Sequence, residues 1–317
     1  MKKLLCCAGV IFTLFTAQAS AAEGYYVNPK SNAAVWVKNN PSDSRAATIK
    51  AKIADVPTAH WFSGTSQADN ALKTTVSAYV TAASNAGKIP LLVAYNIPHR
   101  DCTGGASAGG ASDAAAYQQW IDNFVSGLST HQAVVVLEPD ALADISCLTA
   151  NQQTERLSLL SYAVSRIQSK ATATEVYLDA GHANWIAAAT MAKSLNDANV
   201  KNARGFALNV SNYYTTQQSI DYGNSVIAAL SSNYGYSKSI IIDTSRNGNG
   251  ANAGDWCNPP GRKIGAATGV LFGYALAAWI KTPGNSDGGS SPTADCHGGP
   301  AAGIFSPDLA MKLINGE

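Results

Sequence analysis

Acidic side chains follow several short apolar runs of this sequence, either directly or after a brief loop. These residues are Asp101, Glu138, Asp140, Asp179, Asp243 and Asp287. Carboxyl groups crowded around one site repel each other's charge, which raises at least one pKa and keeps that group protonated near neutral pH. Hydrolysis of a glycosidic bond uses such a set, because one carboxyl protonates the departing oxygen while another assists water. The pattern therefore indicates acid–base chemistry on a neutral substrate.

The same carboxylates have a structural alternative. An Asp at the end of a strand often caps the next helix or holds a turn, and this alternative stays open for each of them. Glu138 and Asp140 are two residues apart, so a regular strand would project both to one face, although Pro139 disturbs that geometry. We expect Glu138 to be a buried, paired structural carboxylate and Asp243 to cap the loop of residues 245–250.

Other kinds of site lack their usual signatures in this sequence. There is no Cys-x-x-Cys pair and no Gly-rich phosphate-binding loop, so we expect no metal and no cofactor. The formal net charge is only +1 and no Lys/Arg run occurs, which argues against a nucleic-acid partner. With 46% hydrophobic and 14% charged residues, the chain has material for a large core and is not a disordered protein.

Short apolar runs rich in β-branched residues alternate with longer segments of helical character. The expected strands are residues 91–97, 134–137, 176–178, 206–210 and 240–242, with weaker candidates at 25–27, 60–62 and 277–280. The expected helices are residues 32–39, 68–86, 112–128, 152–169, 185–196 and 215–232. Continuous apolar strands separated by helices indicate a parallel sheet covered on both faces, and seven or eight such units favour a barrel over an open sheet.

The carboxyl ends of parallel strands meet at one edge of a sheet, so we expect the acidic residues above to share that edge. No Pro/Ser/Thr-rich linker and no internal repeat divides the chain. We therefore expect one catalytic α/β domain over residues 23–317. Trp36 and Trp120 lie in helical segments and are expected in the core.

Residues 1–22 have the pattern of a secretory signal peptide. Lys2 and Lys3 precede the apolar run 4–15, Ala17-Gln18-Ala19 then offers a cleavage site, and Ala22 offers a second. A membrane anchor is the alternative, but about 20 apolar residues are needed to span a bilayer. We expect the mature protein to be extracellular, with no membrane partner.

Four cysteines remain in the expected mature chain: Cys102, Cys147, Cys257 and Cys296. An even number in an exported protein suggests two disulfides, and three pairings are possible. We favour the nearest-neighbour pairing, Cys102 with Cys147 and Cys257 with Cys296, in which each bridge closes a loop of roughly 40 residues.

Several motifs, taken together and in order, resemble glycoside hydrolase family 6. They are Tyr95-Asn96-Ile97-Pro98, Arg100-Asp101-Cys102, Leu137-Glu138-Pro139-Asp140, Tyr177-Leu178-Asp179-Ala180-Gly181-His182, Asp243-Thr244-Ser245-Arg246-Asn247-Gly248-Asn249-Gly250, Trp256-Cys257-Asn258-Pro259, and Trp279-Ile280-Lys281 with Pro283-Gly284 and Asp287. Each motif is weak alone, but the ordered set runs through nearly the whole mature chain. The resemblance implies a secreted β-1,4-glucanase with a distorted α/β barrel that inverts the anomeric centre without a metal.

The resemblance also implies roles in catalysis. Asp140 resembles the general acid, and Asp101 resembles the carboxylate that raises the pKa of that acid and helps to position it. Asp287 resembles the proposed catalytic base, with Ser107 and the backbone holding the water along which the proton passes. Tyr95 would crowd the sugar at the cleavage point and favour its distorted ring.

A second group of residues is expected to bind substrate. Trp61, Trp185 and Trp256 resemble sugar-stacking platforms, Asp179 and His182 would line the cleft, Lys281 resembles a hydroxyl-binding residue, and Asn209 follows a predicted strand toward the same edge. The two favoured cysteine pairs also fit the bridges of the family.

Two departures from the family pattern concern the loop that carries Asp287. The family often has a carboxylate two residues before the base and a cysteine two residues after it. Asn285 and Gly289 occupy those places here, and the cysteine is displaced to Cys296. We therefore expect this loop to be shaped differently.

The expected activity is cleavage of internal β-1,4-glucosidic bonds in cellulose or β-1,4-glucan oligosaccharides by a monomer. Processive enzymes need extra loops to roof the cleft, and a chain of this size leaves little room for them. Two alternatives remain: a cellobiohydrolase of the same family, and a noncatalytic glucan-binding relative. No separate carbohydrate-binding module is visible in the sequence.

Overall fold

The computed structural model describes residues 24–64, 69–102, 105–252, 254–291 and 294–317. The predicted signal peptide therefore lies outside the described residues. Within the described ranges, no helix combines the length and the apolar character that crossing a membrane requires.

The described residues form one eight-stranded sheet in the order β1-β2-β3-β4-β5-β6-β8-β7. The strands are β1 (His60–Ser63), β2 (Leu91–Tyr95), β3 (Ala133–Leu137), β4 (Thr174–Asp179), β5 (Gly205–Leu208), β6 (Ser239–Asp243), β7 (Leu271–Phe272) and β8 (Ala275–Ala278). Neighbouring strands run parallel except for β7, which forms an antiparallel hairpin with β8. A parallel bridge between Thr58 and Trp279 joins the segment before β1 to the segment after β8, so the sheet curls round into a barrel.

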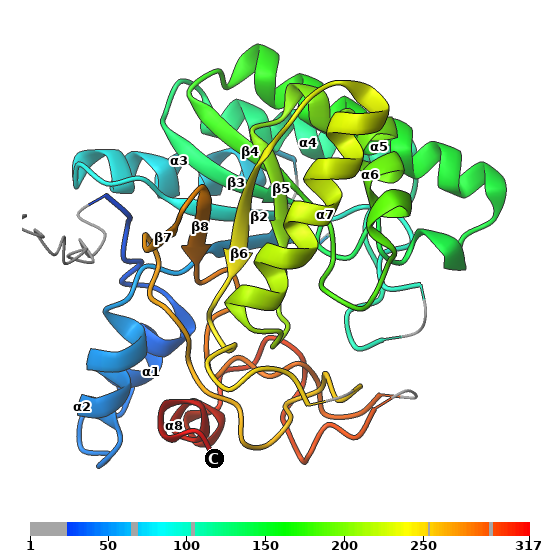
Figure 1. The fold of residues 1–317 in the computed structure, drawn as a ribbon. Helices are drawn as coiled ribbons and strands as arrows, with labels where there is room; N and C mark the ends of the chain where they lie inside the picture. Colours follow the sequence, from blue (N-terminus) through cyan, green and yellow to red (C-terminus); the bar gives the residue numbers. More distant parts are fainter. Residues whose placement is uncertain (1–23, 65–68, 103–104, 253, 292–293) are drawn as a thin grey trace, which may run out of the picture.

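Helices follow most of the strands and surround the sheet (Figure 1). They are α1 (Asn32–Asn39), α2 (Ala46–Ile49), α3 (Asp69–Asn85), α4 (Ala114–Leu128), α5 (Ala150–Lys170), α6 (Ala188–Asp197), α7 (Thr216–Tyr234) and α8 (Pro307–Asn315). From α3 to α7, each helix packs against the next one along the chain. Thr149 and Thr215 start α5 and α7 with complete capping boxes, in which the Thr hydroxyl and a Gln side chain three residues later satisfy free amides.

The alternation of side chains along each strand separates two cores. In β2, Leu91, Val93 and Tyr95 belong to a cluster inside the barrel, whereas Leu92 and Ala94 pack with the surrounding helices. Because successive side chains point to opposite faces of a strand, the last inward position of each strand lies at the carboxyl edge of the barrel. Asp179 and Asp243 share the inward alternation of Tyr177 and Ile241, which lie in the inner cluster.

A third apolar cluster, which we call the closing cluster, lies where β8 returns to β1. Its buried members are Ala33, Ile49, Ile53, Ala54, Trp279 and Ala310. They come from α1, α2, the turn after α2, the end of β8 and α8, so both ends of the chain cover the point where the barrel closes. In Figure 1, α1 and α2 lie beside α8 below the sheet, and the long loops that follow β6 and β8 gather on the same side.

The predicted helices are confirmed, and so are the predicted strands apart from residues 25–27, with ends that differ by a few residues. Residues 25–27 form no strand, because Tyr25 makes only an isolated bridge to Ile89. Helix α6 begins at Ala188 instead of Trp185, because residues 183–186 form a turn before it. Strand β5 ends at Leu208, since Asn209 has a left-handed backbone (φ 66°). The two-residue strand β7 was not predicted, because a run that short has no periodicity. Trp120 is buried in the core as predicted, whereas Trp36 is only half-buried and packs beside Phe305.

Candidate active site

The loops that leave the carboxyl edge of the barrel contain residues in an uncommon backbone conformation. After β2, β3 and β5, six non-glycine residues have positive φ: His99 (55°), Asp101 (53°), Glu138 (50°), Asp140 (68°), Asn209 (66°) and Ser211 (57°). This conformation disfavours most side chains, and its clustering is typical of sites where function dictates geometry. Because Glu138 and Asp140 both lie past the end of β3, strand alternation does not place them on one face.

Asp140 is a partly exposed carboxyl group among other carboxyl groups. Its amide donates to Asp179 Oδ2 at 2.9 Å, and its carbonyl accepts from the amide of Asp144 at 2.9 Å. Removal from water and the charges of Asp179, Asp144 and Asp101 raise the pKa of Asp140 well above its usual range, against a smaller lowering by Lys281. Asp140 is therefore suited to hold a proton and to donate it.

Asp101 lies in a loop that is tightly organised around its own carboxylate. Its oxygens accept the amides of Gly105 at 3.1 Å and Ser107 at 2.7 Å. Arg100 donates to the carbonyls of Ser107 at 2.8 Å and Tyr95 at 2.6 Å, which ties the loop to the end of β2. Through these contacts, Asp101 is held where its charge acts on Asp140.

A disulfide joins the loop of Asp101 to the loop that follows Asp140. Cys102 is bonded to Cys147, with their Cα atoms 6.1 Å apart and a separation of 45 positions in sequence. The second bridge joins Cys257 to Cys296. These are the two pairs that the nearest-neighbour spacing favours.

Asp287 is a buried carboxylate with four donors around it. Arg246 Nη1 and Lys281 Nζ lie 2.7 and 3.0 Å from its oxygens, and the Tyr213 hydroxyl and the Asn258 amide donate at 2.9 and 3.1 Å. Burial raises the pKa of Asp287, but the two cations and their hydrogen bonds outweigh burial and hold the pKa well below its usual range. Asp287 is thus a permanent negative charge and a weak base.

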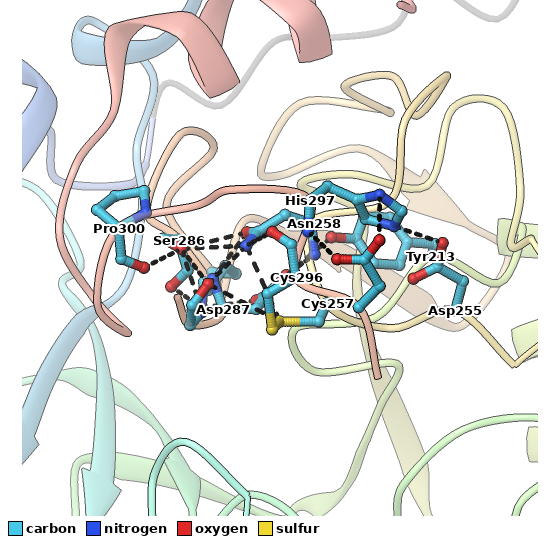
Figure 2. Close-up of a disulfide and its surroundings, with 12 residues drawn as sticks. Tyr213, Asp255, Cys257, Asn258, Ser286, Asp287, Cys296, His297 and Pro300 are labelled. Atoms are coloured by element: carbon cyan, nitrogen blue, oxygen red, sulfur yellow. Dashed lines mark hydrogen bonds and ion pairs between the residues drawn. A yellow bond between two sulfur atoms is a disulfide. The ribbon is translucent and has the colours of Figure 1, made fainter. Parts of the chain in front are cut away.

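Asn258 organises the loop around Asp287 (Figure 2). Its side chain donates to Ser286 Oγ, the Gly288 carbonyl and the Cys296 carbonyl, and it accepts the Asp287 amide at 2.8 Å. Cys257 precedes Asn258, so the bridge to Cys296 holds this network in place. The displaced cysteine of this chain therefore still serves the Asp287 loop, from a position nine residues after Asp287.

Three further carboxylates, Glu138, Asp243 and Asp179, lie below the exposed edge and bind backbone amides. Glu138 accepts the amides of Asn96 and Ile97 at 2.9–3.0 Å, so its partners are amides of the neighbouring loop, as befits a buried structural carboxylate. Asp243 accepts the amides of Ser211, Ser245, Ile280 and Lys281. It therefore caps its own loop, as expected, and also joins the ends of β5, β6 and β8.

Asp179 occupies a different place from the one expected of a residue that lines a cleft. It is only 1% exposed, and its Oδ2 accepts the amides of Asp140 and Gly181 at 2.9 and 3.0 Å. Burial raises its pKa to about 7. Asp179 thus lies beneath Asp140 and acts on that residue through a hydrogen bond and charge.

Asn209 also needs a correction. Its side chain is fully buried; it donates to the carbonyls of Tyr214 and Asp243, and its oxygen accepts the Tyr214 amide. With its amide group engaged in this way, Asn209 holds the loop of residues 209–214 and does not reach a bound sugar.

The ring side chains that we predict to contact substrate, Trp61, His182, Trp185 and Trp256, are at least partly exposed. Trp61 packs edge-on against Tyr95 at 5.3 Å between centroids and donates to the Ile280 carbonyl. His182 stacks on Tyr214 at 4.6 Å and lies beside Trp185, which is 36% exposed. Trp256 is partly exposed next to the second disulfide. Flat rings with one open face suit stacking against sugar rings.

Sequence reasoning missed several residues that shape the site: Arg100, Asp144, Tyr213 and Arg246. Asp144 stands four residues after Asp140, a spacing that brings side chains together in a helical turn, and this signal was available. Arg246 lies in a recognised motif, but nothing in the sequence showed that it would pair with Asp287. Its Nη2 also donates to the Ser211 carbonyl, which joins three loops through one guanidinium.

Comparisons with known proteins agree with this architecture. Residues 18–317 match the family model of "Glycosyl hydrolases family 6". The chain is 47% identical over 293 residues to "Endoglucanase 1" of Streptomyces halstedii, covering 92% of this chain and 89% of that protein. It is 34% identical over 327 residues to a "Probable 1,4-beta-D-glucan cellobiohydrolase C" of Aspergillus fumigatus, covering 86% and 70% of the two chains.

A solved structure shares the fold described above. It is the endoglucanase Cel6 from Mycobacterium tuberculosis in complex with methyl-cellobiosyl-4-deoxy-4-thio-β-D-cellobioside, with a TM-score of 0.83 and 39% identity, covering 93% of this chain and 98% of that one. The family model spans nearly the whole chain, and the ordered motifs, the barrel and the carboxyl cluster all fall within it. The chain belongs to glycosyl hydrolase family 6.

Proposed function

We propose that this glycoside hydrolase is a secreted endo-β-1,4-glucanase that cleaves cellulose and related β-glucans with inversion. The observation that carries the proposal is that two carboxyl groups at the barrel edge, Asp140 and Asp287, have opposite protonation states. Burial and the charges of Asp179, Asp144 and Asp101 raise the pKa of Asp140 and favour its protonated form, and a separate carboxylate, Asp287, stays ionised between two cations. The relatives named as endoglucanases support the endo action.

In the proposed reaction, Asp140 donates its proton to the glycosidic oxygen while the bond from that oxygen to the anomeric carbon breaks. Water attacks the anomeric carbon from the opposite face, which produces inversion. Asp101 opposes early ionisation of Asp140 and thereby keeps the acid loaded. The charge of Asp101 also favours the positive charge that develops on the sugar in the transition state.

The proton released by the attacking water needs an acceptor. Asp287 is engaged with four donors and has a lowered pKa, so it is a poor direct acceptor. We assign the release to a chain of water molecules that starts near Ser107, and Asp287 contributes a fixed charge that orients Lys281. Because Lys281 lies between Asp287 and the carbonyl of Ser286, its remaining hydrogen-bonding capacity suits a sugar hydroxyl.

The glucan chain would lie across the barrel edge on the aromatic surfaces of Trp61, Trp185 and Trp256. The His182 ring contacts the Trp185 ring and also stacks on the Tyr214 ring. Tyr95 lies between Trp61 and the Arg100 guanidinium, and we propose that it crowds the sugar at the cleavage point. We expect the protein to act as a monomer outside the cell, with a β-1,4-glucan as its partner.

Replacing Asp140 with Ala tests the general acid. We expect kcat on unactivated cello-oligosaccharides to fall by about 10²–10⁴-fold, because the leaving oxygen loses its proton donor, while binding is retained. An aryl cellobioside with a very good leaving group should lose far less activity. Asp122→Asn, which changes a surface carboxylate paired with Arg166, is the matched control. Activity that survives in Asp140→Ala on unactivated chains would refute the assignment.

The stereochemistry and the mode of cleavage need separate measurements. Proton NMR of fresh products should show the α anomer first, and an initial β anomer would contradict inversion. An endo enzyme lowers the viscosity of a soluble cellulose derivative early, relative to the reducing ends released. Slow viscosity loss with steady release of cellobiose would instead support the cellobiohydrolase alternative, and binding with no reducing ends would support a noncatalytic relative.

A further inference from the structure

Arg156 is a buried cation in the second turn of α5. The residue is only 2% exposed, and the ion pairs found among the described residues do not include it. An unpaired guanidinium is costly to bury unless its N–H groups are used well. The partners of Arg156 therefore indicate why a cation stands there.

Those partners are backbone carbonyls of the two loops that carry the catalytic carboxyl groups. Nη2 donates to the Pro98 and His99 carbonyls at 2.9 and 2.7 Å, and Nη1 donates to the Ala141 carbonyl at 3.2 Å. His99 precedes Asp101 by two residues, and Ala141 directly follows Asp140. One planar fork thus fixes the two loops relative to each other from inside the protein.

The loops need this tie because several of their residues have an unfavourable backbone conformation. His99, Asp101 and Asp140 all have left-handed φ values, and a non-glycine residue keeps that conformation only where its surroundings hold it. The Cys102–Cys147 bridge joins the same two loops farther along each of them. Arg156 holds the segments on the other side of each carboxyl group: His99 two residues before Asp101 and Ala141 directly after Asp140.

We infer that Arg156 is a positioning residue for catalysis: it sets the placement of Asp101 relative to Asp140, and so the ability of Asp140 to act as the acid. The inference rests on the proposed roles of those two carboxyl groups. It predicts that the geometry of the fork matters as well as its charge, because an ammonium group cannot donate along the same three directions.

The effect on pH dependence has a defined sign. If the loops drift apart, Asp101 raises the pKa of Asp140 less. The charge of Arg156 lowers the pKa of Asp144, so its removal leaves Asp144 protonated to higher pH and weakens a second repulsion on Asp140. Both changes move the loss of activity at high pH to a lower pH.

The experiment compares Arg156→Lys and Arg156→Gln with the unchanged protein. Both variants should lower kcat on cellopentaose by about 10–100-fold with little change in KM, since misplacement of a catalytic group by about 1 Å has an effect of this size. Both should also shift the basic limb of the kcat profile to lower pH. An aryl cellobioside with a very good leaving group should lose much less, because its cleavage requires little protonation.

Two controls separate positioning from simple loss of folding. Arg166→Gln changes a partly exposed arginine of the same helix, which pairs with Asp122 at 2.6 Å, and should leave the profile unchanged. In an Asp101→Asn background, Arg156→Lys, which keeps the positive charge beside Asp144, should produce little further shift of the basic limb. Rates are measured below the thermal transition of each variant, so that unfolded protein does not lower the measured kcat.

Three results would overturn the inference. The first is an unchanged basic limb with equal losses on both substrates, the second is a full additional shift in the Asp101→Asn background, and the third is normal kinetics of Arg156→Lys. None of these concerns the proposed function itself, which is tested separately by Asp140→Ala, by the anomer of the fresh products and by the loss of viscosity.

Discussion

At the scale of single residues, the chemistry of this site depends on which neighbour each carboxyl group has. Asp140 and Asp287 are both acidic residues at the carboxyl edge, yet their pKa values are displaced in opposite directions. Other carboxylates surround Asp140, whereas an arginine and a lysine surround Asp287. The sequence could identify both as candidates because of their positions after strands, but apart from Asp144 it could not give the partners, which come from loops far apart in the chain.

Asp144 offers a direct test of how neighbours set the acid. Burial raises its own pKa to about 6, so Asp144 is ionised above that pH and then repels the charge of Asp140. Asp144→Asn should shift the basic limb of the kcat profile to lower pH by about 0.5–1 unit, which corresponds to about 0.7–1.4 kcal/mol of lost repulsion. Activity in the acidic range should stay close to that of the unchanged protein.

The measurement is kcat on cellopentaose between about pH 4 and pH 9, with Asp122→Asn as the surface control. A basic limb that stays in place would mean that Asp144 has no influence on Asp140.

At the scale of elements, the strand–helix alternation gave nearly the whole barrel, because buried parallel strands and amphipathic helices leave strong patterns in sequence. The loops were harder to predict. Asn209 was expected to meet substrate because it follows a strand, but its left-handed backbone turns its side chain into hydrogen bonds with the next loop. Strand order predicts which loops meet, whereas hydrogen bonding within the loops decides which side chains face outward.

Gly105 tests how tightly the Asp101 loop is built. A Cβ at this position would lie 2.3 Å from Asp101 Oδ1, so Gly105→Ala must displace the carboxylate or the loop. We expect kcat on unactivated chains to fall by about 10–100-fold, with a change in the free energy of unfolding below about 1 kcal/mol, because the loop is on the surface.

Gly24→Ala is the control, since nothing lies within 4 Å of the Cβ that it would add. Unchanged kinetics of Gly105→Ala would show that the loop accommodates the added methyl group without displacing the Asp101 carboxylate enough to affect catalysis.

At the scale of the whole molecule, the buried carboxyl groups link stability to pH. Burial raises the pKa values of Glu138 and Asp179 to about 7, above the value of roughly 4 expected in the unfolded chain. The folded protein therefore binds more protons between these limits, so this contribution to stability is full below about pH 4 and is lost as the pH rises through about 7. Asp287 has a lowered pKa, and its contribution is lost only on strong acidification.

We therefore expect the Tm to be higher at about pH 5 than at about pH 8, as measured by calorimetry at fixed ionic strength. Asp179→Asn keeps an oxygen for the Asp140 and Gly181 amides but cannot ionise. The difference in Tm between the two pH values should shrink in this variant by about 2–4 °C, equivalent to roughly 1 kcal/mol. A variant with the same pH dependence as the unchanged protein would exclude Asp179 as a source of it.

The barrel has one narrow point of closure. Between β1 and β2 the ladder runs over four residue pairs, whereas β1 and β8 are joined through the single bridge at Thr58 and Trp279. Native proteins open first where few backbone hydrogen bonds have to break. The amide of Ala59, which donates to the Trp279 carbonyl, should therefore exchange with solvent sooner than the amides between β2 and β3. Lys281 lies two residues beyond that bridge, so the ammonium group that pairs with Asp287 stands beside the narrowest seam of the barrel.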